Sequence, residues 1–150
     1  MKMDAVDLEL INQLQTDCKQ SIRSLAEKVN LSITPTHERI KRLEASGVIT
    51  GYRAIVDHKV LGKTLTAYCN VKLTKHSKSY ISEFETFIST LNEVVEVIYL
   101  TGSSDYLLKV VLKDMQDFQN FVLEKLSSLE IISEIESSFV INQVKKIVRV

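Results

Sequence analysis

The sequence lacks the features that mark several large classes of protein. Its only two cysteines, Cys18 and Cys69, lie far apart and have the spacing of neither a metal site nor a disulfide scaffold, so we expect two reduced thiols. The 19 basic and 19 acidic residues cancel, so the net charge does not indicate a nucleic-acid partner. No apolar run approaches membrane-spanning length, and acids rather than an apolar secretory core follow the first residues. We therefore expect a cytoplasmic protein with no membrane partner.

The chain does contain enough apolar residues to build a core, and its charges are unevenly distributed. Hydrophobic residues make up 45% of the 150 positions, which argues against disorder and allows one domain or two small ones. Between His37 and Lys63 there are six lysines or arginines and three acids, whereas from Thr64 onward there are nine basic and eleven acidic residues. The local positive excess favours DNA binding in the first half. Because this excess of positive charge is small, binding through two or more copies of the chain is favoured.

The stretch from Leu31 to Leu43 predicts a DNA-reading helix. Ser32 or Thr34 can cap its start, and Pro35, the only proline, is tolerated in a first turn because its missing N–H has no partner there. Ile40 and Leu43 lie three positions apart, so they share one face, which we expect to be buried. The opposite face would carry base-edge donors and acceptors near its N-terminus and phosphate-binding cations further on.

The residues of this helix that we predict to bind DNA are polar or cationic. Ser32 suits a cap or a phosphate ligand, and the cations suit phosphates or guanine edges. Thr36 carries a conflict, because the helical periodicity also places it toward the core. A solvated amphipathic helix without a ligand is the alternative interpretation. The predicted DNA-binding residues are Ser32, Thr34, Thr36, His37, Arg39, Lys41 and Arg42.

A second short helix before this one completes a helix-turn-helix. Ser21 to Val29 has apolar residues at helical spacing, and Asn30 follows where a left-handed residue commonly ends a helix. An earlier helix begins after a cap at Asp4 and ends near Thr16. Val48 to Val56 is β-branched and aromatic, which predicts a wing or a linking strand. Together these elements predict a winged helix-turn-helix.

After residue 56 the periodicity changes and a second domain is expected. Polar residues and Gly62 interrupt the pattern in segment 57–63, which predicts a hinge. Beyond it, alternating residues predict strands and residues at helical spacing predict helices. The expected elements are strand 65–73, helix 80–91, strands 94–100 and 106–112, a helix capped by Asp114, and an extended stretch at 131–144. This order is ferredoxin-like.

The predicted fold class is therefore α+β, and the second domain requires a partner. In the ferredoxin-like order both helices cover one face of the sheet. The hairpin nevertheless offers apolar residues to both faces, with Val97 and Tyr99 pointing one way and Val94 and Ile98 the other. We infer a homodimer joined through the sheets. The predicted domains are a winged helix-turn-helix at 1–56, a hinge at 57–63, and a ferredoxin-like βαββαβ domain for effector binding and oligomerisation at 64–150.

Motifs along the whole chain carry a resemblance to a known family. They include Thr34-Pro35, Glu38-Arg39, Arg42-Leu43-Glu44, Gly47-Val48-Ile49 and Gly51-Tyr52, followed by Gly102 and Asp105-Tyr106-Leu107-Leu108. On these residues the chain resembles the leucine-responsive regulator/AsnC (Lrp/AsnC) family, the feast/famine transcription regulators of bacteria and archaea. The resemblance implies a DNA-binding N-terminal domain. It also implies a C-terminal domain that dimerises, often assembles to octamers and senses amino acids at contacts between dimers.

Residues 101–105, between the two hairpin strands, form the candidate sensing loop. An amino acid presents an ammonium, which Asp105 can pair with, and a carboxylate, which backbone N–H groups around Gly102 can bind. The alternative is a turn whose Asp and Ser side chains bond their own backbone. Two positions depart from the family pattern: Ile33, where Pro is common, and Ser104, where an aromatic residue is common. The predicted effector-binding residues are Thr101, Gly102, Ser103, Ser104, Asp105 and, from a neighbouring subunit, Ser138.

We therefore predict a homo-oligomeric, sequence-specific transcriptional regulator whose assembly or DNA binding responds to an amino acid. Its partners would be double-stranded DNA, the effector and further copies of the chain, from a dimer up to an octamer. An architectural DNA-binding protein without a ligand is one alternative. An enzyme on the ferredoxin-like domain is another, which the sequence disfavours because His37, His58 and His76 are not paired with a nucleophile. We expect no catalytic residues, no cofactor and no metal.

Overall fold

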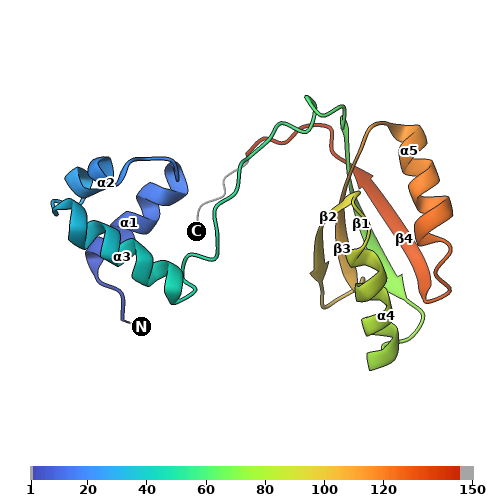
Figure 1. Ribbon diagram of the computed structural model, residues 1–150. Coiled ribbons are helices and arrows are strands. Elements are labelled where there is room, and N and C mark those ends of the chain that lie inside the picture. Colours follow the sequence, from blue (N-terminus) through green and yellow to red (C-terminus); the bar gives the residue numbers. More distant parts are fainter. Residues whose placement is uncertain (1, 146–150) are drawn as a thin grey trace. The chain divides into compact units, whose positions relative to one another are not determined.

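The computed structural model describes residues 2–145, which form two compact units (Figure 1). The first unit extends to Ile55, and the second from Val56 to Val144. Each unit has a hydrophobic core of its own. Within residues 2–145, no helix has the length and apolar character needed to span a membrane.

Three helices make up the first unit: α1 (Ala5–Thr16), α2 (Ile22–Lys28) and α3 (Ile33–Ala45). A capping box begins α1, because Asp4 accepts a hydrogen bond from the Asp7 N–H while Asp7 accepts one from the Asp4 N–H. The two bonds satisfy backbone donors that the start of a helix leaves free. The predicted helix from Asp4 to Thr16 is confirmed.

One left-handed residue makes the turn between α2 and α3. Asn30 has a φ of 54°, a conformation in which asparagine is tolerated, and α2 ends just before it. The apolar sides of the three helices then meet in a core of Leu10, Leu25, Val29 and Ile40, none more than 9% exposed. This is the helix-turn-helix that the sequence predicts, with α3 as its second helix.

Of the two possibilities predicted for residues 48–56, a wing or a linking strand, the strand does not form, and the expectation of a strand is wrong. The segment is irregular, and the Ile49 N–H bonds back to the Leu43 carbonyl at the end of α3. A strand needs a neighbouring strand for its hydrogen bonds, and the described residues of the first unit form none. The Tyr52 hydroxyl instead donates to the Glu44 carboxylate at 2.8 Å. Burial and this bond raise the pKa of Tyr52 to about 12.

The second unit is a four-stranded antiparallel sheet with helices in the predicted βαββαβ order, so the ferredoxin-like fold is confirmed. The strands lie in the spatial order β2-β3-β1-β4. The elements are β1 (Leu65–Leu73), α4 (Lys78–Ser89), β2 (Val94–Tyr99), β3 (Tyr106–Leu112), α5 (Met115–Asn120), the π-helix η1 (Phe121–Leu126) and β4 (Ile132–Phe139). The final extended stretch is therefore shorter than residues 131–144.

One face of this sheet carries the core. Cys69 of β1 pairs with Leu108 of β3, and both side chains are fully buried. Phe84 of α4 and Phe121 of η1 belong to the same cluster, so both helical segments cover this face. In η1 the two buried residues, Phe121 and Leu126, lie five positions apart. The wider π turn brings them to one side, which the α-helical repeat would not do.

The opposite face of the sheet is less apolar than predicted. A β-bulge between Val94 and Glu96 shifts β2, so that Val94, opposite Val110, faces the helices together with Val97. The prediction that Val94 and Val97 point to opposite faces is therefore wrong. The face that the helices leave uncovered mixes apolar, polar and charged residues: Ile98, Leu107, Tyr68, Asn70, Lys109 and Glu136.

Candidate DNA-binding and effector sites

The exposed side of α3 carries most of the residues predicted to read DNA. Thr34, His37 and Lys41 follow one another at three and four positions, so they share a side of the helix, and all are exposed. Ser32 is exposed at the N-cap position, where its side chain makes no capping bond. Small polar groups thus stand near the N-terminus of α3 and an ammonium further along, which suits base edges and phosphates respectively.

Thr36 lies on the other side of α3. Its side chain is fully buried, and its hydroxyl donates to the Ser32 carbonyl at 2.9 Å. A buried side chain cannot reach a base edge or a phosphate. Thr36 is therefore withdrawn from the predicted DNA-binding residues, because its position in the core outweighs its polar character.

Two carboxylates at the start of α1, those of the N-cap Asp4 and of Asp7, bind the two arginines of α3. Arg39 Nη1 lies 2.7 Å from Asp4 Oδ2 and 2.8 Å from Asp7 Oδ1. Arg42 Nη2 donates to both oxygens of Asp7, at 2.9 and 2.8 Å. Asp7 is 1% exposed, and burial alone would raise its pKa. The Arg39 bond, the Asp4 backbone bond and the Arg42 charge outweigh burial and hold the pKa of Asp7 below its ordinary value.

These ion pairs change what the arginines can offer to DNA. Most of the Arg39 side chain is buried, whereas half of the Arg42 side chain remains exposed. Lys41 is exposed and has no ion-pair partner among residues 2–145. The role of Asp7 could not be predicted from the sequence, because 32 positions separate Asp7 from Arg39 and only the packing of α1 on α3 brings them together. Asp7 thus fixes the orientation of α3 on α1.

In the second unit, Asp105 ends the loop between β2 and β3 with both carboxylate oxygens engaged. Its Oδ2 accepts the Leu73 N–H at 2.7 Å, and its Oδ1 lies 2.8 Å from Nε2 of His76. The Asp105 N–H donates to the Val71 carbonyl at 2.9 Å. Asp105 therefore ties the loop to the end of β1. An ammonium could reach this carboxylate, which is 15% exposed, only by displacing the more exposed His76.

The remaining residues of the loop differ in their exposure to solvent. Residues 101–103 are exposed and Ser104 is half-buried. Gly102 has a φ of +128°, which L side chains rarely adopt, so glycine is required at this point of the loop. Ser138 is exposed and pairs with Tyr68 near the middle of β1, whereas the loop bonds to the end of that strand. One protomer does not bring Ser138 and the loop together.

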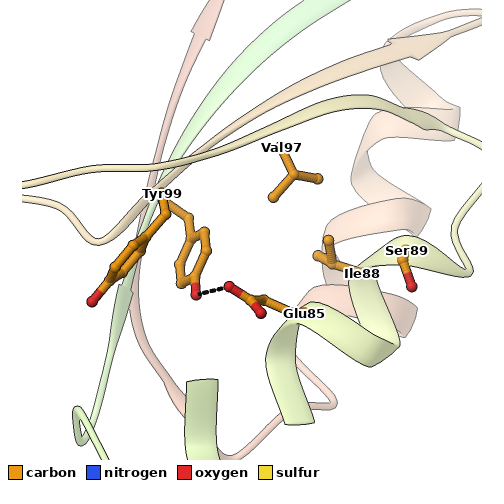
Figure 2. Close-up of a pocket in the computed structure, with 6 residues that line it drawn as sticks. Glu85, Ile88, Ser89, Val97 and Tyr99 are labelled. Atoms are coloured by element: carbon orange, nitrogen blue, oxygen red, sulfur yellow. Dashed lines mark hydrogen bonds between the residues drawn. The ribbon is translucent and has the colours of Figure 1, made fainter. Parts of the chain in front are cut away.

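A cavity of about 290 Å³ lies between α4 and the hairpin, next to the residues that flank the loop. Figure 2 shows Ile88 and Val97 on its walls, with Tyr99 on the strand that enters the loop. The Tyr106 hydroxyl donates to Glu85 Oε1 at 2.9 Å, as the dashed line in Figure 2 marks. Burial and Glu85 both raise the pKa of Tyr106, so it remains a neutral donor. That Glu85 and Tyr99 line a cavity was not predicted, because their local sequence patterns are those of surface residues.

Two family models match the chain, one in each half. The model described as winged helix-turn-helix DNA-binding matches residues 3–50, and the model described as Lrp/AsnC ligand binding domain matches residues 66–150. Among curated proteins, the chain is similar to the DNA-binding transcriptional activator DecR of Escherichia coli K12. The two are 36% identical over 143 residues, which cover 95% of this chain and 94% of the relative.

Solved structures give the same result. A transcriptional regulator of Neisseria meningitidis in complex with L-Met superposes with a TM-score of 0.94 at 30% identity, covering 98% of this chain and 95% of its own. An AsnC family transcriptional regulator of Agrobacterium tumefaciens has a TM-score of 0.93 at 31% identity, covering 99% and 96%. The similarity therefore extends over both units of the chain.

Proposed function

Since the chain belongs to the Lrp/AsnC family and is a DNA-binding transcriptional regulator with a ligand-binding domain, we propose that its ligand is an amino acid and acts by changing how copies assemble on DNA. The L-Met complex of the neisserial relative supports this ligand class. An effector shifts assembly only as far as its affinity differs between assembly states. Copies that assemble bring several DNA-binding units to the operator at once, which raises affinity by avidity.

The polar side of α3, held in place by a buried carboxylate, is the observation that carries the DNA-binding part of the proposal. Thr34 and His37 would contact base edges, and Lys41 and Ser32 would contact phosphates. Arg42 keeps an exposed half and would add a second cation beside Lys41. Paired copies of α3 would read two major-groove half-sites about 34 Å apart.

The effector would bind at the loop between β2 and β3. Backbone N–H groups around Gly102 would hold its carboxylate, and Asp105 would accept its ammonium in place of His76. The apolar wall that Ile88 and Val97 give the neighbouring cavity supports an effector with an apolar side chain. Ser138 would join the site from a second copy of the chain.

Assembly would begin with a homodimer joined through the sheet face that the helices leave uncovered. Tyr68, Leu107 and Lys109 lie on this face, and the Lys109 ammonium is 5.8 Å from the centre of the Tyr68 ring. Such a mixed surface is typical of an interface that gains specificity from charge as well as burial. Residues 1–56 would then act as the DNA-binding domain, 57–63 as the hinge and 64–150 as the effector domain.

Light scattering and thermal unfolding of the full chain, repeated with each of the twenty amino acids, test the proposal. A bound ligand raises the unfolding temperature by mass action, and a change of particle mass reports assembly. Asp105→Ala should retain DNA binding and lose the amino-acid response, because the loop loses both its attachment to β1 and its ammonium partner. A monomer that responds to no amino acid would contradict the proposal.

An architectural DNA-binding protein without a ligand would bind DNA and show no thermal shift with any amino acid. We infer no enzymatic activity, because the family is one of transcription regulators and no nucleophile–base pair was found in the sequence. We also propose a cytoplasmic location, where a regulator of transcription meets bacterial or archaeal DNA.

A further inference from the structure

The two oxygens of the Asp105 carboxylate have partners of different kinds. Oδ2 accepts the Leu73 N–H at 2.7 Å, and the Asp105 N–H donates to the Val71 carbonyl, so backbone groups tie the loop to β1. Oδ1 lies 2.8 Å from Nε2 of His76, and Nε2 must carry the proton because a carboxylate only accepts hydrogen bonds. Asp105 can therefore exchange its partner at Oδ1 while the loop stays attached through Oδ2.

The His76 ring can leave this bond without a movement of the backbone around it. Its side chain is 60% exposed, whereas that of Asp105 is 15% exposed. Before His76, the N–H and the hydroxyl of Thr74 both donate to the Ile131 carbonyl, at 2.9 and 3.3 Å. After it, Ser77 is the N-cap of α4, and its side chain accepts a backbone N–H. Since the backbone is held on both sides, rotation of the exposed ring about its side-chain bonds is enough to uncover Oδ1.

The neighbouring lysine lies elsewhere and does not take the place of His76. Lys75 Nζ lies over the Tyr80 ring, 5.6 Å from its centre. Within residues 2–145, the ion pairs of the structure give Asp105 one partner, His76. An incoming ammonium therefore meets a carboxylate that already has a donor, and it gains only the difference between the old bond and the new one.

We propose that His76 is an internal competitor of the effector, a role that rests on the function proposed above for the loop. Its imidazole occupies the place of the ligand ammonium at Oδ1 of Asp105, and an amino acid binds after the ring has turned away. The apparent affinity falls in proportion to the fraction of molecules in which Oδ1 is uncovered. A carboxylic acid without an ammonium makes no bond to Oδ1 and does not compete with the ring. His76 thus raises the concentration at which an amino acid is sensed, and it does so for amino acids alone.

Thermal-shift titrations of the full chain measure the apparent Kd of wild type and of His76→Ala. The probes are the twenty amino acids and, for each one that binds, the acid in which a hydrogen replaces the ammonium. The amino-acid Kd should fall about tenfold in His76→Ala, which corresponds to a ring that covers Oδ1 in about nine molecules of ten. The acids without an ammonium should gain no affinity. A merely structural role of His76 would instead weaken the binding of amino acids.

Two further variants separate competition from structure. His76→Gln places an amide N–H near the position of Nε2, so it should restore most of the wild-type Kd. His58→Ala removes an exposed histidine of the segment before β1 and should leave the Kd unchanged.

The possible outcomes distinguish the competition from the loop site itself. Binding that tightens in His76→Ala, or that is detected only in this variant, supports the competition. An amino-acid Kd that is unchanged or raised in His76→Ala overturns the competition and leaves the loop site standing. No response to any of the twenty amino acids, in wild type and in His76→Ala, overturns the proposed effector function and the competition with it.

Discussion

Different interactions stabilise the interiors of the two units of this protein. Among residues 2–145, the second unit has fourteen buried hydrophobic residues in one cluster, whereas the cluster of the first unit has four. The first unit adds the buried carboxylate of Asp7, which joins α1 to α3 through Arg39 and Arg42. Apolar burial is nearly independent of pH, but an ion pair is weakened by protonation of its acid and by salt. The packing of α3 on α1 should therefore depend more on pH and salt than the packing of the sheet does.

The largest loss of stability is expected from a substitution in the hydrophobic cluster of the second unit. Leu108→Ala should lower the free energy of unfolding of the second unit by about 3 to 4 kcal/mol, because the fully buried side chain leaves a cavity against its neighbours. Leu123→Ala, at a side chain that is 70% exposed, should cost less than about 0.5 kcal/mol. Urea unfolding, monitored by hydrogen exchange in β1 and β3, measures the loss of stability in both variants. Equal losses would mean that the cluster is not the source of stability.

A smaller loss of stability is expected when the ion pairs of Asp7 in the first unit are broken. Asp7→Asn should lower the stability of the first unit by about 2 kcal/mol, because the neutral amide cannot satisfy two guanidinium groups. Operator affinity should fall as α3 loses its fixed orientation on α1. Asp17→Asn, an exposed carboxylate at the end of α1, is the matched control and should change neither quantity. A loss below about 0.5 kcal/mol in Asp7→Asn would remove the distinction between the units.

Low pH should destabilise the first unit more than the second. The pKa values of Asp4 and Asp7 are both lowered from 3.8, the first mainly by the Asp7 backbone bond and the second despite its burial. Groups with a lowered pKa stabilise the fold above the unfolded pKa, and this contribution disappears as the pH falls through the folded pKa. The first unit should therefore lose stability from about pH 5 downward. Hydrogen exchange in α1 and α3 between pH 6 and pH 3 measures the loss, which Asp7→Asn should largely abolish.

The smallest effect concerns the exposed side of α3. Lys41→Ala should leave the stability within about 0.5 kcal/mol of wild type and reduce the slope of log affinity against log salt by about 0.9, the value for one lost phosphate contact. Arg39→Ala should instead reduce stability, because it leaves Asp7 with one partner fewer. Thr34→Ala should change the preferred sequence rather than the salt slope. A Lys41→Ala variant with an unchanged slope would place this lysine away from DNA.

Local patterns made most of the fold predictable from sequence. Asp4 three positions before Asp7 gives the capping box of α1, and Asn30 gives the left-handed end of α2. The alternation from Leu65 to Leu73 matches β1, whose register with β3 runs without interruption. These features depend on residues within a few positions of one another, so their causes are visible in the linear sequence.

The features that sequence analysis missed depend on partners far along the chain. Val48 to Val56 has the composition of a strand, but only a neighbouring strand could have made it one. Asp105 bonds to Leu73, 32 positions away, so its role in fixing the loop cannot be read from the turn. The bulge after Val94 reverses the side to which that residue points, and no local signal marks it. The DNA-binding and effector residues themselves remain predictions.

The π-helix η1 sets the direction of a lysine as well as the packing of two apolar residues. Because the buried Phe121 and Leu126 lie five positions apart, Lys125 stands one position before the core residue Leu126 and reaches Glu93. Regular α-helical winding of the same residues would place Leu126 about 140° from Phe121 around the helix axis. Lys125 would then lie only about 40° from Phe121, on the core side, and Glu93 Oε1 would lose its donor. One surplus residue in a helix thus decides whether a carboxylate on another element remains anchored.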